Sequence, residues 1–287
     1  MTYTTSAVSL SDMALEEVDY ETFISWHKRE LEAEPARNFS FLVQLNKIAK
    51  DPKALKEARF WSTGTDMALA LLCNGTIVFG EIEQDNFQYF TQQELLGAVR
   101  RLRGPEPIIA HMAQTFGKNG IEFSKPMPQV TMELSAEPSA PVSKGHSRKA
   151  QENDIELLAE WCHKFQAEAM PDLPAVPTKH LETRCVELVN DEAIAIWEDE
   201  GEKVSTAAIV TRLPRCEAVS LVYTPPVLRS NGYAGSVVSY LSKEIINSGR
   251  LACLYVDARN PISARCYQTV GYEPVGHHVD AIRIRTK

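Results

Sequence analysis

The residues whose types and spacing could do chemistry lie between positions 222 and 234. Just before them, residues 217–223 form an apolar, β-branched run that predicts a strand. Pro225 and Pro226 end this strand, because proline cannot donate a hydrogen bond to a sheet. Apolar residues then recur at helical spacing over 234–245. The predicted order is therefore strand, rigid turn, Arg-x-x-Gly-x-Ala, helix.

This order predicts a seat for a phosphate or pyrophosphate at the start of the helix. The first turn of a helix has unpaired N–H groups and the positive end of the helix dipole. Gly232 lies where the helix begins, and the absence of a Cβ lets a ligand approach the backbone. Arg229 adds a cation that can bind two phosphate oxygens at once. A glycine-containing helix start without a ligand is the alternative for this hexapeptide alone.

A second motif lies about thirty residues further on, in the stretch 254–275. Asn260 stands at the N-cap of a predicted helix, Tyr267 follows seven residues later, and Gly271-Tyr272 ends the helix. Taken together, the two motifs resemble the GNAT superfamily of acetyl-CoA-dependent N-acetyltransferases. The resemblance covers roughly 148–285.

The resemblance implies a fold of the α+β (mixed α/β) class with two parts. Residues 143–287 would form a catalytic GNAT domain, a central mixed β-sheet flanked by helices. Residues 1–142 would form a smaller, degenerate GNAT-like α+β domain, because the opening of the later part at 145–150 is similar to a subgroup with such a copy. The stretch 135–148, rich in Pro, Ser and small residues, predicts a linker or a crossing strand.

By the same resemblance, the activity is transfer of an acetyl or other short acyl group from acyl-CoA to an amine, within a ternary complex. A backbone N–H near Val222 would polarise the thioester carbonyl. Asn260 would bind the pantetheine arm, and Tyr267 would protonate the departing thiolate. The residues implied to bind acetyl-CoA are Leu221, Val222, Tyr223, Arg229, Ser230, Asn231, Gly232, Tyr233, Ala234, Asn260, Ser263 and Tyr267.

The reaction needs a proton acceptor, because an alkyl amine with a pKa of about 10 is mostly protonated at neutral pH. Glu217, at the start of the central strand, is the candidate catalytic base. Glu168 and Asp172, in the region expected to face the acceptor, are alternatives. For each carboxylate, a solvated surface charge remains the competing interpretation.

Composition limits the class of protein and its partners. The net charge is −8, with 30 Lys and Arg against 38 Asp and Glu, which disfavours a nucleic-acid partner. No apolar run approaches the roughly 20 residues of a membrane span, and no secretory signal is evident, so we expect a cytoplasmic protein. The six cysteines form no metal-binding spacing and are expected to be buried, with no metal cofactor. The expected partner is a small-molecule or peptide amine, and both monomer and homodimer stay open.

Hydrophobic periodicity and turn residues predict the remaining elements. In the first half, helices are expected within 18–49, 94–103 and 108–117, and strands at 58–62, 67–73, 76–82 and 129–134, with a hairpin turn at Asn74-Gly75. In the second half, helices are expected at 152–165, 178–189, 234–245 and 260–270, and strands at 193–198, 205–213, 217–223, 251–257, 272–275 and 279–284.

Two other functional classes were weighed. A catalytically silent acyl-CoA sensor or protein-interaction module is the main alternative, since no base is unambiguous. A dinucleotide-binding Rossmann domain is disfavoured, because Gly-x-Gly-x-x-Gly does not follow a first strand and a meander precedes the βαβ unit.

Overall fold

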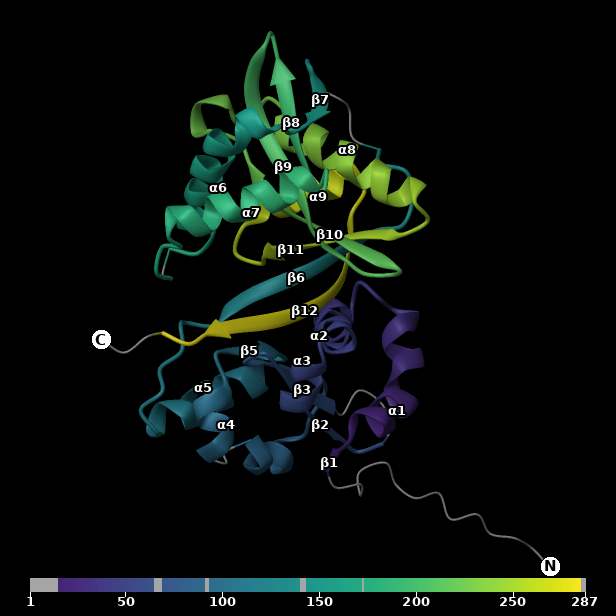
Figure 1. Cartoon of the computed structure of the whole chain (residues 1–287), viewed down its shortest axis with the longest axis vertical. Coiled ribbons are helices and arrows are strands. Elements are labelled where there is room, and N and C mark those ends of the chain that lie inside the picture. The colour runs from purple at the N-terminus through teal and green to yellow at the C-terminus, as the bar shows by residue number, and fades with distance from the viewer. Residues whose placement is uncertain (1–14, 65–68, 91–92, 140–142, 172, 285–287) are drawn as a thin grey trace, which may run out of the picture. The chain divides into compact units, whose positions relative to one another are not determined.

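A computed structural model describes residues 15–64, 69–90, 93–139, 143–171 and 173–284 (Figure 1). The chain forms two compact units. The first comprises Met1–Ala33, Ser40–Pro126 and Val279–Lys287, and the second comprises Glu34–Phe39 and Met127–His278. Among the described residues, every helix is too short or too polar to cross a bilayer.

The first unit is a mixed sheet with helices on both faces. Its strands lie in the order β1-β2-β3-β4-β5, followed by the end of β12, and only the β4–β5 pair is parallel. The strands are β1 (Glu16–Val18), β2 (Arg59–Ser62), β3 (Leu69–Cys73), β4 (Thr76–Phe79) and β5 (Arg101–Gly104). The helices are α1 (Tyr20–Ala33), α2 (Phe39–Lys50), α3 (Pro52–Glu57), α4 (Gln93–Ala98) and α5 (Glu106–Lys118), with a 3-10 segment η2 (Gln84–Phe90).

Alternation along β3 shows why this sheet carries helices on both faces. Leu69 and Leu71 belong to one buried cluster with side chains of α1 and α2, whereas Ala70 and Leu72 belong to another with side chains of α5. Successive side chains of a strand point to opposite faces, so a fully apolar strand requires cover on both. The predicted hairpin turn is confirmed, since Asn74 and its following glycine both have positive φ.

The second unit contains the predicted phosphate seat. Its strands lie in the order β12-β6-β11-β10-β9-β8-β7, and the β10–β11 pair is parallel. The strands are β6 (Met127–Leu134), β7 (His146–Lys149), β8 (Ile194–Asp199), β9 (Glu202–Arg212), β10 (Cys216–Tyr223), β11 (Leu251–Asp257) and β12 (Glu273–Ile282). The helices are α6 (Ile155–Ala169), α7 (Thr178–Asn190), α8 (Tyr233–Asn247) and α9 (Pro261–Val270), with 3-10 segments η3 (Glu152–Asp154) and η4 (Pro226–Leu228).

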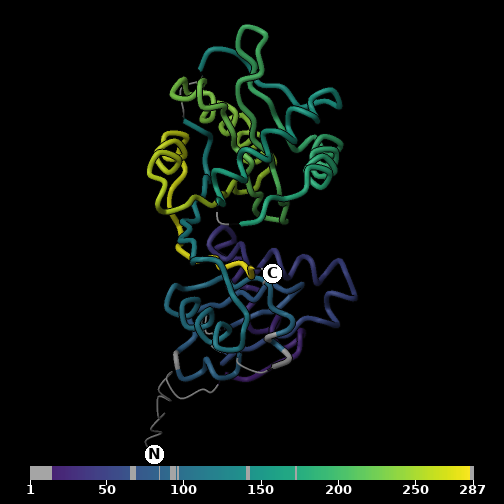
Figure 2. The backbone as a smooth tube through the Cα atoms, turned by 90° about the vertical axis from the view of Figure 1, so that its left-hand side faces the viewer, coloured from purple at the N-terminus to yellow at the C-terminus, as the bar shows by residue number. Residues whose placement is uncertain are grey.

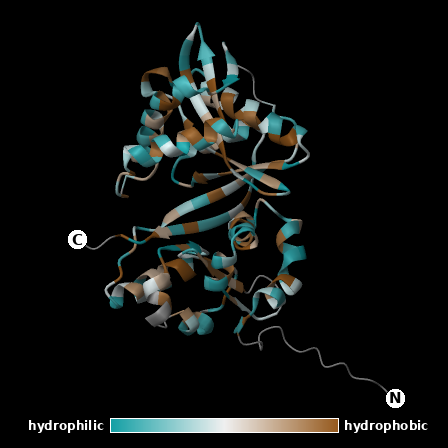
Figure 3. Cartoon of the chain, in the orientation of Figure 1, coloured by the Kyte–Doolittle hydropathy of each residue, from teal (hydrophilic) through white to brown (hydrophobic). Residues whose placement is uncertain are grey.

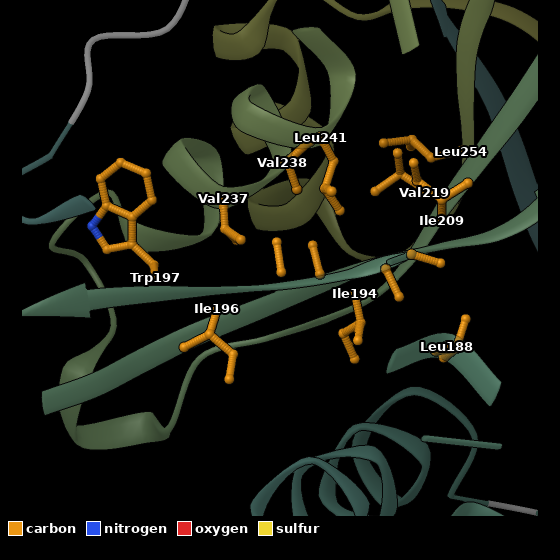
Figure 4. Close-up of a cluster of buried hydrophobic side chains, with 14 of the residues drawn as sticks. Leu188, Ile194, Ile196, Trp197, Ile209, Val219, Val237, Val238, Leu241 and Leu254 are labelled. Atoms are coloured by element: carbon orange, nitrogen blue, oxygen red, sulfur yellow. The ribbon is translucent and has the colours of Figure 1, made fainter. Parts of the chain in front are cut away.

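A continuous hydrophobic core joins these helices to the sheet (Figure 4). Val237, Val238 and Leu241 point from α8 toward the strands, while Leu188 of α7 packs from the other side. Hydrophobic and hydrophilic residues interleave along the covering helices, as Figure 3 shows. This pattern is that of amphipathic helices, whose apolar stripe drives the packing. The expected α+β fold with a mixed sheet is confirmed.

Two element predictions were wrong. The helix predicted over 94–103 ends at Ala98, and residues 101–104 instead form β5 between β4 and β12. The two strands predicted at 272–275 and 279–284 are one strand, β12. In both cases pairing with distant strands overrides the local sequence pattern.

The two units repeat one order of elements. The series β1, α1, α2, β2, β3, β4, α4, β5, α5, β6 corresponds to β7, α6, α7, β8, β9, β10, α8, β11, α9, β12, with α3 as the addition. The last strand of each series completes the other unit: β6 pairs with β11, and residues 279–282 of β12 pair with β5. Figure 2 shows β12 and β6 as neighbouring yellow and teal tubes.

The repeated order supports the hypothesis that 1–142 is a degenerate copy of 143–287, which stays a prediction. The predicted boundary falls at residues 140–142, which lie outside the described residues. The compact units divide between Pro126 and Met127, because residues 129–134 of β6 pair with residues 252–257 of β11.

Candidate functional site

The central feature of the second unit is the separation of two parallel strands. β10 and β11 pair at three positions, the last of which is Ala218 with Cys253. Both strands continue for several described residues, to Tyr223 and Asp257, without further pairing to each other. In the described structure, the facing backbone edges beyond Ala218 therefore do not pair with each other.

A β-bulge lies in the diverging part of β10. Pairing with β9 shifts between Ser220 and Tyr223, so that two residues of β10 stand opposite one of β9. Leu221, inside the bulge, has φ of 53°, a conformation that non-glycine residues seldom adopt. A bulge bends its strand and increases the local twist, which accounts for the departure of β10 from β11.

The strand leads into a loop that ends at a helix without a side-chain cap. Ser230 and Gly232 have φ of 68° and 80°, and Gly232 is the N-cap of α8. In the described structure, the backbone N–H groups of residues 230–235 donate to no protein acceptor. Among the described residues, a Cβ on Gly232 would come within 4 Å of Ser143 alone, at 3.5 Å, so the described structure does not crowd the loop backbone at Gly232. The arrangement fits a phosphate or pyrophosphate bound to backbone donors.

Arg229 has protein partners in this structure. Its Nη2 donates to both carboxylate oxygens of Glu168, at 2.9 and 2.7 Å, and its Nε donates to the carbonyl of Thr224 at 3.0 Å. Its guanidinium also lies 5.9 Å from the ring centroid of Tyr223. Arg229 thus connects the end of α6 to the turn before the phosphate seat, a contact that the sequence analysis did not foresee.

Two further contacts at the seat were missed by sequence reasoning. Ser143 donates its N–H to Oγ of Ser236 at 2.9 Å, and the two hydroxyls lie 2.8 Å apart. The hydroxyl of Tyr233 donates to Oδ2 of Asp199 at 2.6 Å. Neither partner could be found from the sequence, because the linker and the β8–β9 hairpin approach α8 only through the fold.

Helix α9 has the predicted ends. Oδ1 of Asn260 accepts the N–H of Ser263 at 3.1 Å, Pro261 occupies the first helical position, and Gly271 caps the end with φ of 110°. Because α9 packs against the first turn of α8 near Gly235, the two motifs lie side by side.

Tyr267 lies on the side of α9 that packs against the core. It is partly buried, and its ring lies 6.2 Å from that of Tyr272 in an edge-on arrangement. Burial raises the pKa of Tyr267 well above its usual value, with a smaller contribution from Cys266. A tyrosine hydroxyl is protonated at neutral pH with or without this shift, so Tyr267 has a proton to donate.

Glu217 does not lie with the other predicted catalytic residue. Its side chain is only 4% exposed and contacts Arg250 at 2.7 Å and Arg212 at 3.5 Å. Since strands rise about 3.3 Å per residue, it lies roughly 17 Å from Val222 along β10. Glu217 thus forms ion pairs at the start of β10. Its distance from Val222 disfavours it as a base that acts at a thioester near that residue.

Glu168 and Asp172 are the two alternative candidate bases. Glu168 lies at the seat, but Arg229 engages both of its oxygens. Asp172 lies outside the described residues.

Among the described residues, no group of three or more His, Cys, Asp or Glu is arranged to hold a metal ion. The cysteines are free thiols, and all but Cys266 are buried.

Comparisons with known proteins bear on the fold of the chain. The family model described as FR47-like protein matches residues 197–279, which span β9, β10, the seat and α9. A Drosophila protein of known structure matches with a TM-score of 0.64 and 14% identity, covering 93% of this chain and 98% of its own.

Two solved GNAT structures match almost end to end. A GCN5-related N-acetyltransferase from Sphaerobacter thermophilus has a TM-score of 0.57 at 14% identity, covering 97% of this chain and 98% of its own. A GNAT-family acetyltransferase from Colwellia psychrerythraea has a TM-score of 0.52 at 9% identity, covering 94% and 99%. Comparison with curated proteins gives no match. The chain therefore has the GNAT acetyltransferase fold over nearly its whole length.

Proposed function

We propose that this GNAT-fold chain is an N-acyltransferase that moves an acetyl or other short acyl group from acyl-CoA to the amine of a small molecule or peptide. The observation that carries the proposal is the separation of β10 from β11 beyond Ala218 and Cys253, followed directly by the uncapped start of α8. The first feature suits an extended pantetheine arm, and the second suits the pyrophosphate at its end.

In this mechanism the protein supplies position and polarity. Backbone donors of residues 230–234 hold the pyrophosphate. A backbone N–H near Val222 stabilises the negative charge that develops on the thioester oxygen, an effect of a few kcal/mol per donor. Asn260 and Ser263, at the start of α9, would contact the pantetheine arm.

The proton transfers complete the reaction. The amine nitrogen bonds to the carbonyl carbon, the C–S bond breaks, and the departing thiolate takes the proton of the Tyr267 hydroxyl. The acceptor, mostly an ammonium ion at neutral pH, loses one proton before attack and a second after it. Because two arginines hold Glu217 and one holds Glu168, we propose that water accepts these protons and that solvent returns one to Tyr267.

A calorimetric titration with acetyl-CoA tests the binding half of the proposal. The parent should bind, and Gly232→Asp should not, because a carboxylate would enter the seat beside the phosphates. Gly97→Asp, on α4 of the first unit with nothing within 4 Å of the added Cβ, is the matched control and should bind normally. A folded Gly232→Asp variant with parental affinity would contradict the assigned seat.

The alternative is an acyl-CoA sensor without catalysis. The ion pairs of the two described candidate bases favour it, since Glu217 contacts Arg250 and Glu168 contacts Arg229. A panel of primary amines, assayed by release of free CoA thiol, separates the two. Turnover with any amine establishes the transferase, whereas tight binding without thiol release establishes the sensor.

A further inference from the structure

The linker that precedes β7 lies against the phosphate seat. Ser143 contacts Ser236 through both its N–H and its hydroxyl, and its Cβ stands 3.5 Å from the position that a Cβ of Gly232 would occupy. Ser236 in turn donates to the carbonyl of Gly232 at 3.2 Å. The linker is therefore part of the wall of the seat, although its sequence carries no phosphate-binding pattern.

The next residue, Lys144, has a fixed backbone. Its carbonyl accepts the indole N–H of Trp197 at 2.8 Å, and Figure 4 shows that this nitrogen points away from the hydrophobic cluster. Gly145 has φ of 99°, and a Cβ there would stand 2.1 Å from the carbonyl oxygen of Glu198. The backbone of Lys144 is thus held between an anchor on α8 and an anchor on β8, while its side chain is exposed.

The charged side chains described next to the seat do not by themselves favour a ligand that carries several phosphate charges. Arg229 is paired with Glu168, and Asp199 is present beside the first turn of α8 through its bond to Tyr233. These three side chains together carry a net charge of −1, which repels a ligand with several phosphate charges. In the part of the chain that the structure describes, Lys144 has no ion pair, so its charge is available to a ligand.

We propose that Lys144, supplied by the linker, binds a phosphate group of the acyl-CoA, in the role that the sequence pattern assigned to Arg229. The inference rests on the proposed function and extends it to the residue that sets affinity for the phosphates. A lysine side chain is a flexible point charge, and Lys144 directly follows Ser143, which is hydrogen-bonded to Ser236 in the first turn of α8.

Calorimetric titration with CoA tests this role. Lys144→Gln should weaken binding about fivefold to twentyfold, and Lys144→Arg should restore most of the affinity. The loss should shrink as salt is raised, because exposed charges are screened. Lys179→Gln, which removes an exposed lysine on α7, is the matched control and should change the affinity less than twofold.

Dephospho-CoA identifies the phosphate that is bound. An equal loss with dephospho-CoA assigns Lys144 to the pyrophosphate, and disappearance of the loss assigns it to the 3′-phosphate. Affinities of Lys144→Gln and Lys179→Gln that both match the parent would overturn the inference and leave the proposed function standing. A parent that binds neither CoA nor acetyl-CoA would instead overturn the proposed function.

Discussion

The two units differ in how far their pair of parallel strands stays together. In the second unit, β10 and β11 stop pairing at Ala218 and Cys253, well before either strand ends. In the first unit, the corresponding strands β4 and β5 stay in contact to their ends. A Cβ on Gly104, the last residue of β5, would stand 2.8 Å from Cβ of Phe79, the last residue of β4.

The segments that follow β4 and β10 also differ, in their burial and in the length of the helix that comes next. After β10 comes an exposed loop with uncapped N–H groups and a helix of 15 residues. After β4 comes η2, whose Phe87 and Phe90 are buried, and then α4, with only 6 residues. The first unit therefore has buried aromatic side chains in the segment that follows β4, where the second unit has an exposed loop after β10. The two units thus share a topology, and the interrupted pairing on which the proposed acyl-CoA site depends belongs to the second.

The largest effect is expected from Tyr267. Its counterpart by position, seven residues after the N-cap of α5, is Met112, which is buried and carries no proton to donate. Tyr267→Phe should lower turnover about 100-fold, since general acid catalysis contributes at least that much, with acetyl-CoA affinity changed less than twofold. Steady-state kinetics and calorimetry measure the two quantities. Parental turnover across the pH range would remove Tyr267 from the mechanism, and Met112→Leu should leave turnover unchanged.

A smaller effect is expected on stability at Gly104. Alanine there must displace the backbone and side chain of Phe79, and φ of 158° is itself unfavourable, so Gly104→Ala should lower the free energy of unfolding by about 1–3 kcal/mol. Gly235→Ala, in α8, is the control, because its Cβ would meet Cys266 and Val270 at an ordinary 3.8 Å. Urea denaturation measures both. Equal stabilities for the two variants would show that β4 and β5 are not held together as closely as described.

The smallest effect concerns acid stability of the first unit. His27 is buried, its Nε2 lies 2.6 Å from Oγ of Ser62, and burial lowers its pKa. In the unfolded chain this histidine takes up a proton near pH 6.5, whereas the folded chain resists it, so stability should fall as the pH drops below about 6.5. Each pKa unit of lowering corresponds to about 1.4 kcal/mol.

Substitution of His27 isolates this contribution. His27→Gln should flatten the dependence of the unfolding free energy on pH between 6.5 and 5, as measured by urea denaturation at each pH. An unchanged slope would place the acid sensitivity elsewhere. Acetyl-CoA affinity measured at pH 7.5 should be the same in both proteins, because His27 belongs to the unit that lacks the seat.

Sequence reasoning found what local chemistry determines. The caps of α9 at Asn260 and Gly271 and the strand and helix around Gly232 all depend on residues a few positions apart. It failed for residues 101–104, whose identity as a strand depends on β12, about 180 positions later. A weak local pattern cannot reveal such a partner.

The same reason explains the functional side chains. Glu217 and Arg229 were singled out by type and position, but their charges are engaged by Arg250 and Glu168, which come from distant segments. Whether a carboxylate or guanidinium is available to a ligand depends on what the fold places beside it. The sequence revealed the loop backbone because glycine and proline act on their own neighbourhood.

The exchange of last strands has a consequence for synthesis of the chain. The β5 partner in the first unit is the end of β12, and Arg101 and Arg103 both bond to the buried Asp280. A ribosome delivers β12 long after β5, so the sheet of the first unit is complete only once β12 has also emerged. Late, long-range pairing of this kind slows folding and leaves the edge of β5 exposed to other chains in the interval.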